Sequence, residues 1–186
     1  KRAGRSLLNI INDILDFSKL EASRVELEKR TFDVNQLIED TCLLQAAAVN
    51  DKDVMVIYTA LPGKRKFIIG DEKRLGQCIT NLISNAIKFT EHGRVIIRPA
   101  IIDNSEQKEC RLEISVADDG IGMDDRTQNQ IFEEFIQADA STTRKYGGTG
   151  LGLPITKQFI ELMNGSIEMN SVIGVGTTVK VSVPVD

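Results

Sequence analysis

The pattern of apolar positions divides the chain into an N-terminal helix and a longer region of mixed helices and strands. Over residues 1–23 apolar side chains recur nearly all round a predicted helix. Such a helix is not stable alone in water, so it needs a partner helix or a second copy of itself. The pattern ends near Ala22-Ser23, so we expect a domain boundary there, with residues 24–186 as the main domain.

The main domain is predicted to contain three helices and several short strands. Asp33 is a candidate N-cap for a helix to about Val49, and a second, amphipathic helix covers 75–90. A third covers 153–163 and ends at Asn164-Gly165. Strands are expected at 25–32, 54–59, 67–69, 94–102, 111–117, 166–170 and 177–183. This order predicts an α+β two-layer sandwich, with a mixed, largely antiparallel sheet packed on three helices.

Composition narrows the class of protein. The 186 residues are 41% hydrophobic and 27% charged, which is ordinary for a globular domain. The net charge of −4 argues against a general nucleic-acid binder. The three cysteines fit neither a disulfide framework nor a zinc pattern, which favours a reducing compartment. Without a long apolar run or signal peptide, this region is expected to be cytoplasmic, whether or not a longer parent protein is membrane-anchored.

The helix at 75–90 carries the first candidate site residues. Asn81, Asn85 and Lys88 gather on the side opposite its apolar arc, at spacings that make their side chains neighbours. Two amides and one ammonium could hold a metal ion and phosphate oxygens. An ordinary solvated helix face is the alternative interpretation.

A first glycine loop follows the strand at 111–117, in the sequence VADDGIGM. Gly120 and Gly122 allow backbone torsions and close approaches that a β-carbon would forbid. A carboxylate beside such a loop can accept a hydrogen bond from a ligand amine. Spacing alone does not choose between Asp118 and Asp119, and many ordinary β-turns share this pattern.

A second glycine run, residues 147–152, leads directly into the helix at 153–163. Glycines at a helix N-terminus expose N–H groups and the positive end of the dipole, which bind anions. The run matches neither the Walker nor the Rossmann pattern. The preceding segment has the composition of a mobile basic flap, with Arg144 and Lys145. Further upstream, Phe132 and Phe135 share one predicted helical face, as core aromatics also would.

In this order, the features resemble the catalytic, ATP-binding domain of hybrid sensor histidine kinases, relatives of the gyrase-type ATPases. The N box looks like 81–90, the first glycine box like 118–122, the F box like 132–135, and the second glycine box like 148–153. Residues 6–21 look like the second helix of the family's dimerisation and phospho-acceptor hairpin. The resemblance covers nearly the whole chain and implies the histidine kinase ATP-binding fold, preceded by one hairpin helix.

The resemblance also implies ATP and Mg²⁺ as cofactors and a role for each matched residue. Asp118 matches the acid that reads the adenine amino group, and Asn85 matches the magnesium ligand. Asn81 would assist the metal and, with Lys88, contact the phosphates as a catalytic residue. Further nucleotide contacts are implied for Phe89, Gly120, Gly122, Gly148, Thr149, Gly150, Leu151 and Gly152, with Arg144 or Lys145 approaching from the lid.

The implied activity is transfer of the ATP γ-phosphate to a histidine on the protein's own dimerisation domain. The phosphate would pass to a response regulator or receiver domain, and the full-length protein would be a homodimer. The family's acceptor histidine lies upstream of the residues matching 6–21, whereas His92 falls in a predicted turn at 91–93 without a motif. We therefore expect a phosphate donor that lacks its acceptor.

Two other functions stay open. One is a nucleotide-binding regulatory module without phosphotransfer. The other is a gyrase-type ATPase, but Asn81 stands where those enzymes carry a glutamate that activates water. Because an amide cannot act as a general base, the residue at position 81 argues against ATPase turnover.

Overall fold

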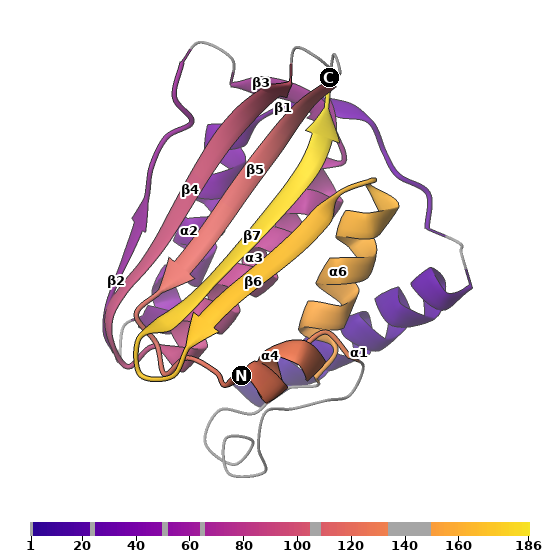
Figure 1. Cartoon of the computed structure of the whole chain (residues 1–186). Coiled ribbons are helices and arrows are strands. Elements are labelled where there is room, and N and C mark those ends of the chain that lie inside the picture. The colour runs from indigo at the N-terminus through magenta and orange to yellow at the C-terminus, as the bar shows by residue number, and fades with distance from the viewer. Residues whose placement is uncertain (1, 23–24, 50–51, 64–65, 105–108, 134–149) are drawn as a thin grey trace.

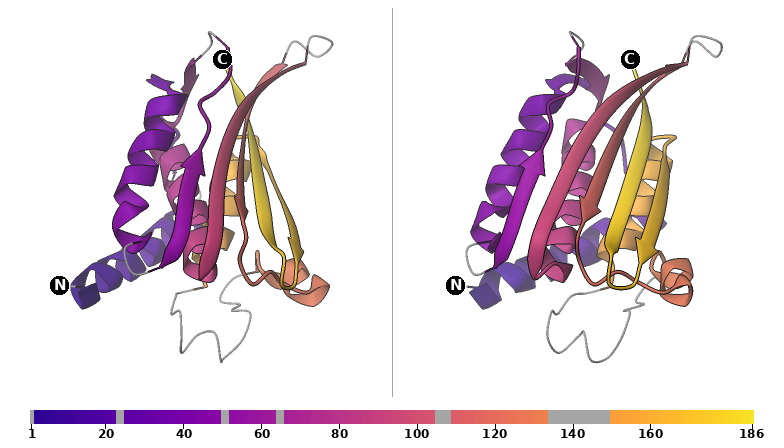
Figure 2. Two further views of the ribbon diagram at one scale, coloured as in Figure 1. Left: turned by 90° about the vertical axis from the view of Figure 1, so that its left-hand side faces the viewer. Right: turned by 60° about the vertical axis from the view of Figure 1, so that its left-hand side comes forward.

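The structure is a computed structural model that describes residues 2–22, 25–49, 52–63, 66–104, 109–133 and 150–186. A five-stranded sheet is covered on one face by three helices (Figure 1, Figure 2). The strands, in spatial order, are β2 (Asp53–Tyr58), β4 (His92–Asn104), β5 (Glu109–Asp118), β7 (Gly176–Val185) and β6 (Ser166–Val172). The helices are α2 (Val34–Val49), α3 (Glu72–Phe89) and α6 (Gly152–Leu162). Since β2 and β4 pair in parallel and the other pairs are antiparallel, the predicted α+β sandwich is confirmed.

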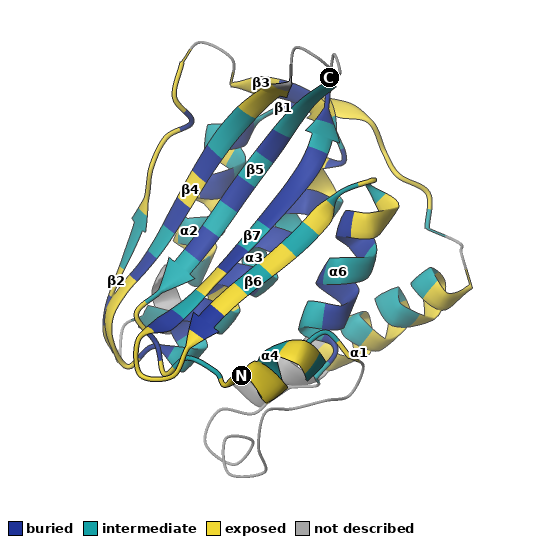
Figure 3. Cartoon of the chain, in the orientation of Figure 1, coloured by how far each residue is buried: buried dark blue, intermediate teal, exposed yellow. Residues whose placement is uncertain are grey.

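The core lies between α3 and the inner face of the sheet. The apolar arc predicted for this helix is buried, and its residues are Leu75, Ile79, Leu82, Ile83, Ala86 and Ile87; Cys78 is buried beside them. Burial alternates along the strands, as Figure 3 shows, because successive side chains point to opposite faces. Burial also raises the pKa of the Cys78 thiol to about 12.

Helix boundaries follow the predicted capping chemistry. Asp33 Oδ1 accepts hydrogen bonds from the backbone N–H groups of Asn35 and Gln36 at the start of α2, so this N-cap is confirmed. At the end of α6, Asn164 adopts a positive φ of 57° and Gly165 N–H donates to the Ile160 carbonyl at 2.8 Å. The predicted C-cap is confirmed as well.

Two strand predictions need correction. A strand was predicted at 25–32, but β1 covers only Arg30–Asp33, because its partner β3 (Phe67–Gly70) offers four residues for pairing. The predicted turn at 91–93 is also wrong in part, since His92 and Gly93 belong to β4. They do so because the parallel partner β2 begins opposite them, with Asp53 beside His92.

The N-terminal helix α1 (Arg2–Glu21) runs beside α6 at one edge of the molecule (Figure 1). Phe17 and Leu20 pack against the core. The other apolar side chains of α1 that the structure describes are exposed: Leu8, Ile10, Ile11, Ile14 and Leu15. Among the described helices, none is long and apolar enough to cross a membrane.

Candidate functional site

The polar side of α3 meets the first turn of α6. Asn81 Nδ2 donates a hydrogen bond to Thr156 Oγ1 at 2.9 Å. A β-carbon at position 152 would lie 2.5 Å from Asn81 Oδ1, so only glycine lets the start of α6 approach this amide. The structure therefore brings Asn81 and Gly152 together, as the two boxes require.

The N-terminus of α6 is suited to an anion. Gly150 adopts a positive φ of 73°, the buried Leu151 stands at the N-cap position, and no side chain caps the helix. Among the described residues, the N–H groups of the first turn thus lack a side-chain cap, and such groups together with the helix dipole favour an anion. Arg144, Lys145, Gly148 and Thr149 lie outside the described residues, as do Phe135 and the predicted flap.

Lys88 and Phe89 lie at the C-terminal end of α3. The Lys88 ammonium sits 4.8 Å from the centre of the Phe89 ring. Both side chains are partly buried, as is Asn85 one turn earlier on the same helix. Desolvation lowers the pKa of Lys88 below its ordinary value. An anionic ligand would restore the favourable environment that burial removes from this cation.

Asp118 lies at the end of β5, facing the glycine loop. Its Oδ1 accepts hydrogen bonds from the backbone N–H of Gly120 at 2.9 Å and of Thr177 at 3.3 Å. Its Oδ2 has no hydrogen-bond partner within the part of the chain that the structure describes. Desolvation raises the pKa of Asp118 against the effect of these two donors. The carboxylate is thus oriented by one oxygen and leaves the other for a ligand.

Asp119 has a different environment. Its Oδ2 accepts hydrogen bonds from the Arg94 side-chain Nε at 3.0 Å and the Arg94 backbone N–H at 3.1 Å. The bond from the Arg94 side chain holds the pKa of Asp119 below its ordinary value. The Asp119 side chain is 42% exposed, so its role is to pair with Arg94 at the surface. Geometry therefore separates the two acids that spacing left equivalent, and favours Asp118 as the ligand acceptor.

Close backbone packing explains the glycines of the first loop. A β-carbon at Gly120 would lie 2.8 Å from the Phe89 carbonyl oxygen. At Gly122, where φ is +66°, it would overlap the Val172 carbonyl. The loop is therefore pressed between the end of α3 and the β6–β7 hairpin, with no room for side chains at these two positions.

Thr177 is a site residue that the sequence reasoning missed. Besides its N–H contact to Asp118, its Oγ1 lies 2.8 Å from Ser171 Oγ. Ser171 Oγ in turn accepts from Met123 N–H at 2.8 Å, at the end of the glycine loop. The only sequence signal was a Gly-Thr pair at the start of a strand, which is too common to single out.

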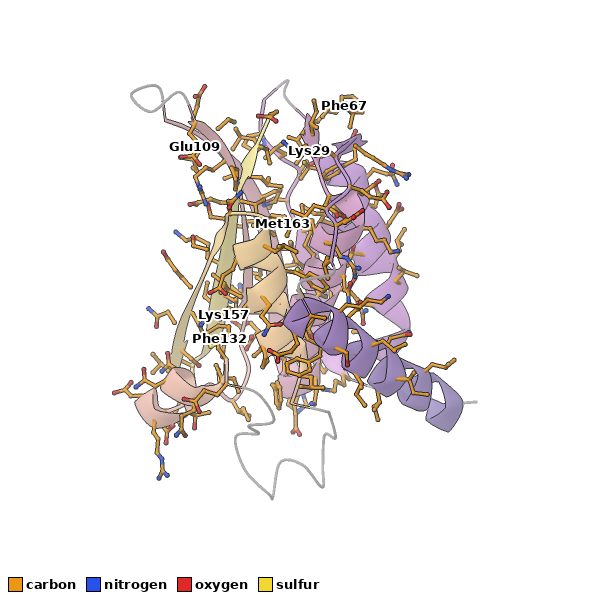
Figure 4. The ribbon with its side chains drawn as sticks, turned by 90° about the vertical axis from the view of Figure 1, so that its right-hand side faces the viewer. Lys29, Phe67, Glu109, Phe132, Lys157 and Met163 are labelled. Carbon is orange, nitrogen blue, oxygen red and sulfur yellow. The ribbon has the colours of Figure 1, made fainter. Side chains whose placement is uncertain are left out.

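The F box prediction is wrong in its geometry for Phe132. The short helix α4 (Asp125–Gln130) ends before it, and Phe132 lies in the following turn. The Lys157 ammonium of α6 lies 6.0 Å from its ring centre, and Figure 4 shows the two side chains together. Phe132 therefore links the segment after α4 to α6 rather than lying on a helical face.

Among the described residues, the contact recorded for the His92 side chain is with Asp53. Its side chain is largely exposed at the start of β4, with Nδ1 3.5 Å from the exposed Asp53 carboxylate. Across the described ranges, no group of three or more His, Cys, Asp or Glu side chains could hold a metal ion.

Comparison with known proteins agrees with this geometry. Residues 70–186 match the family model of the histidine kinase-, DNA gyrase B- and HSP90-like ATPases. The chain belongs to this family. Within it, the chain is an ATP-binding catalytic domain of the kind found in hybrid sensor histidine kinases, as the relatives below indicate.

One relative is hybrid signal transduction histidine kinase A of Dictyostelium discoideum, 42% identical over 99% of this chain and 9% of its own length. Sensor histidine kinase GacS of Pseudomonas protegens is 40% identical over 95% of this chain and 19% of its own. The crystal structure of full-length ShkA in complex with AMPPNP superposes with a TM-score of 0.84 at 31% identity, covering 99% of this chain and 37% of ShkA. The chain thus spans less than a fifth of the length of these curated relatives.

Proposed function

We propose that the chain binds Mg-ATP between α3, the loop after β5 and the start of α6. The γ-phosphate then passes to a histidine on a dimerised helix hairpin of which α1 is one helix. Receiver domains or response regulators would take the phosphate onward, in a homodimeric, cytoplasmic assembly. The similarity to hybrid kinases, and to an AMPPNP-bound one, supports this proposal.

Each polar group has a defined task in this proposal. Asp118 accepts from the adenine amino group through Oδ2, because Oδ1 is already held by two backbone N–H groups. Lys88 and the N-terminus of α6 bind the phosphates. The second glycine box, Arg144 and Lys145 would complete the phosphate site, with Phe89, Gly120 and Gly122 bordering the nucleotide.

The residues present fit a magnesium ion. Asn81 Oδ1 is directed at the start of α6, and Asn85 lies on the same helix face one turn later. Mg²⁺ prefers oxygen ligands and usually takes several of them from water and phosphates, so one or two amide oxygens suffice. The bound metal would neutralise charge on the phosphates. Asn81 and Asn85 would orient it, while the amide at position 81 supplies no base for water.

The observation that carries the phosphotransfer proposal is the divided surface of α1. One face packs on the nucleotide-binding domain through Phe17 and Leu20, while Leu8, Ile14 and Leu15 on the other are at least half exposed. An apolar stripe of this kind is typical of a helix that pairs with others in a bundle. We infer that residues 1–23 belong to such a bundle and residues 24–186 to the catalytic domain.

The test is to add the complete hairpin, carrying its upstream histidine, to this chain with Mg-[γ-³²P]ATP. We expect acid-labile phosphohistidine on the hairpin and no labelling of His92. Asn85→Ala should abolish the transfer, whereas Asn170→Ala, at an exposed asparagine of β6, should not. ATP binding without any transfer would support the regulatory module instead. Steady phosphate release without the hairpin would support a gyrase-type ATPase.

A further inference from the structure

The last carbonyl groups of α3 have a complete set of partners. The final carbonyls of a helix lack intrahelical donors and must be satisfied by other groups. The Ala86 carbonyl accepts from Thr90, through its N–H at 3.1 Å and its Oγ1 at 2.7 Å. The Phe89 carbonyl accepts from Ile121 N–H at 3.3 Å. The carbonyls of residues 87, 88 and 90 remain, and one distant side chain binds all of them.

That side chain is Lys52, in the segment just before β2. Its ammonium donates to the carbonyl oxygens of Ile87 at 2.7 Å, Lys88 at 2.8 Å and Thr90 at 2.9 Å. An ammonium has three N–H donors, so it has one donor for each of these three carbonyls. Its charge also lies at the negative end of the helix dipole, where a cation is most favourable. Lys52 therefore caps the helix from 35 to 38 residues away in the sequence.

This cap leaves the chain extended where α3 ends. Many helices satisfy their last carbonyls with a left-handed glycine, which reverses the chain direction. Here Thr90 has φ −100° and ψ 127°, so the chain runs straight on toward β4. Lys52 supplies donors to the carbonyls of residues 87, 88 and 90. The Phe89 carbonyl between them faces the first glycine loop and accepts from Ile121 N–H.

The end of α3 and the glycine loop are packed without spare room. A β-carbon at Gly120 would lie 2.8 Å from the Phe89 carbonyl oxygen and 2.6 Å from Asp118 Oδ1. Any displacement of the Phe89 peptide therefore displaces the loop and the Asp118 carboxylate with it. The Lys88 side chain projects from the same turn that Lys52 holds.

We propose that Lys52 is a positioning residue for nucleotide binding, a role that rests on the proposed function. By fixing the last turn of α3, it sets the distance between Lys88 at the phosphate side and Asp118 at the adenine side. Lys52 acts through backbone carbonyls and does not itself contact the nucleotide. Its loss should weaken Mg-ATP binding even while the chain remains folded.

The experiment compares Lys52→Met and Lys52→Arg with Lys180→Met in the whole chain. Lys180 forms ion pairs with Glu113 and Glu168 on the sheet, so its variant controls for the loss of a lysine charge. Calorimetric titration should show Mg-ATP affinity reduced by about tenfold or more in Lys52→Met. Lys52→Arg should recover most of it, because the guanidinium keeps the charge and several donors. A folded Lys52→Met that binds as tightly as the wild type would overturn the proposal.

A second measurement uses the wild-type chain, in case Lys52→Met does not fold. The ammonium protons of Lys52 should exchange slowly enough for direct observation by ¹⁵N NMR. Saturating Mg-ATP should shift this signal and leave the backbone amide signal of Lys180 unchanged. If the wild type binds Mg-ATP and the Lys52 signal does not move, only the positioning role is wrong. If the wild type does not bind Mg-ATP, the proposed function fails and this role fails with it.

Discussion

The glycine loop after β5 and the helix α1 differ in how far their side chains and backbone groups find partners within the chain. In the loop, one carboxylate oxygen and the neighbouring carbonyls are bound by groups of the same chain. In α1, Leu8 is 60% exposed and Leu15 51%, so a large part of its apolar surface is left uncovered. Under the proposed function the loop is already arranged to bind a ligand, whereas α1 would be covered by another helix of a bundle. Substitutions in the loop should therefore change ligand binding, and those in α1 should change assembly.

The attachment of α1 is itself polar on one side. Asp16 pairs with Arg74 at 3.2 Å and accepts from Gln77 at 2.7 Å, and both charged side chains are only 15% exposed. Arg74 also lies 4.6 Å from the centre of the Phe159 ring. Because a buried ion pair adds little net stability, we expect this contact to act mainly on the angle at which α1 packs against the domain.

The largest effect is expected from Gly176→Ala, at the start of β7, where the backbone packs against Asp118. Gly176 has φ +136°, and a β-carbon there would overlap the Asp118 carbonyl oxygen. We expect a loss of about 3 kcal/mol or more in unfolding free energy, together with loss of Mg-ATP binding. Gly174→Ala is the control, because Gly174 also has a positive φ of 74° but nothing within 4 Å. It should cost only about 1 kcal/mol by chemical denaturation. Equal losses of unfolding free energy in the two variants would show that backbone strain at positive φ, and not packing against Asp118, determines the cost.

Exchange of the two acids gives the next largest effect. Asp118→Asn should weaken Mg-ATP binding by about 1.5 to 3 kcal/mol, because a hydrogen bond to a charged acceptor is lost. Asp119→Asn should have a much smaller effect, because Asp119 is paired with Arg94 at the surface. Isothermal titration calorimetry on both variants measures the difference. A larger loss in Asp119→Asn would mean that the adenine acceptor has been assigned to the wrong residue.

Short-range sequence patterns predicted most of the helices and their ends, because helix formation and capping depend on residues that are close in the sequence. The apolar arc of α3, the N-cap at Asp33 and the C-cap at Asn164 follow from helical spacing and backbone chemistry. The start of β4 and the short β1 did not follow, because each is set by the length of a partner strand elsewhere in the chain. Strand limits are a property of the pair and cannot be obtained from one strand.

The site shows the same division. Glycine spacing and the amides of α3 selected candidate ligand groups, which the structure places on α3, in the loop after β5 and at the start of α6, but Thr177 and Lys52 carried no signal specific enough to select them. Both act through backbone contacts with residues far away in sequence, such as Asp118 and Ile87. The choice between Asp118 and Asp119 required a family resemblance, whereas the structure separates them by burial and by Arg94.

The contact between Asp16 and Arg74 should have a moderate effect. A double-mutant cycle with Asp16→Ala and Arg74→Ala should give a coupling free energy of about 1 kcal/mol, measured by chemical denaturation. Mg-ATP affinity should change little in Asp16→Ala, because α1 does not contribute to the glycine loop. A strong loss of Mg-ATP affinity in Asp16→Ala without a coupling free energy would contradict the view that α1 affects assembly and the loop affects ligand binding. Glu26→Ala, at an exposed residue beyond α1, serves as the control for removal of an acidic charge.

The smallest expected effect is the pH dependence of stability and Mg-ATP affinity that arises from Asp118 in the loop. Desolvation raises the pKa of Asp118 above the ordinary 3.8, so the folded chain holds this proton more tightly than the unfolded chain. Its contribution to stability is therefore favourable at low pH and declines as pH rises from 3.8 through the raised value. Mg-ATP affinity should change in the opposite sense, falling as acidification protonates the acceptor of the adenine amino group.

Because Asp119 has a lowered pKa, its contribution to stability is lost on acidification and would mask that of Asp118. The informative quantity is the difference in unfolding free energy between the wild type and Asp118→Asn, measured at successive pH values. As pH rises, this difference should fall, whereas the corresponding difference for Asp119→Asn should rise. A difference independent of pH for Asp118→Asn would mean that the carboxylate is not desolvated in the free chain. The Asp118 carboxylate would then be desolvated only when the nucleotide binds.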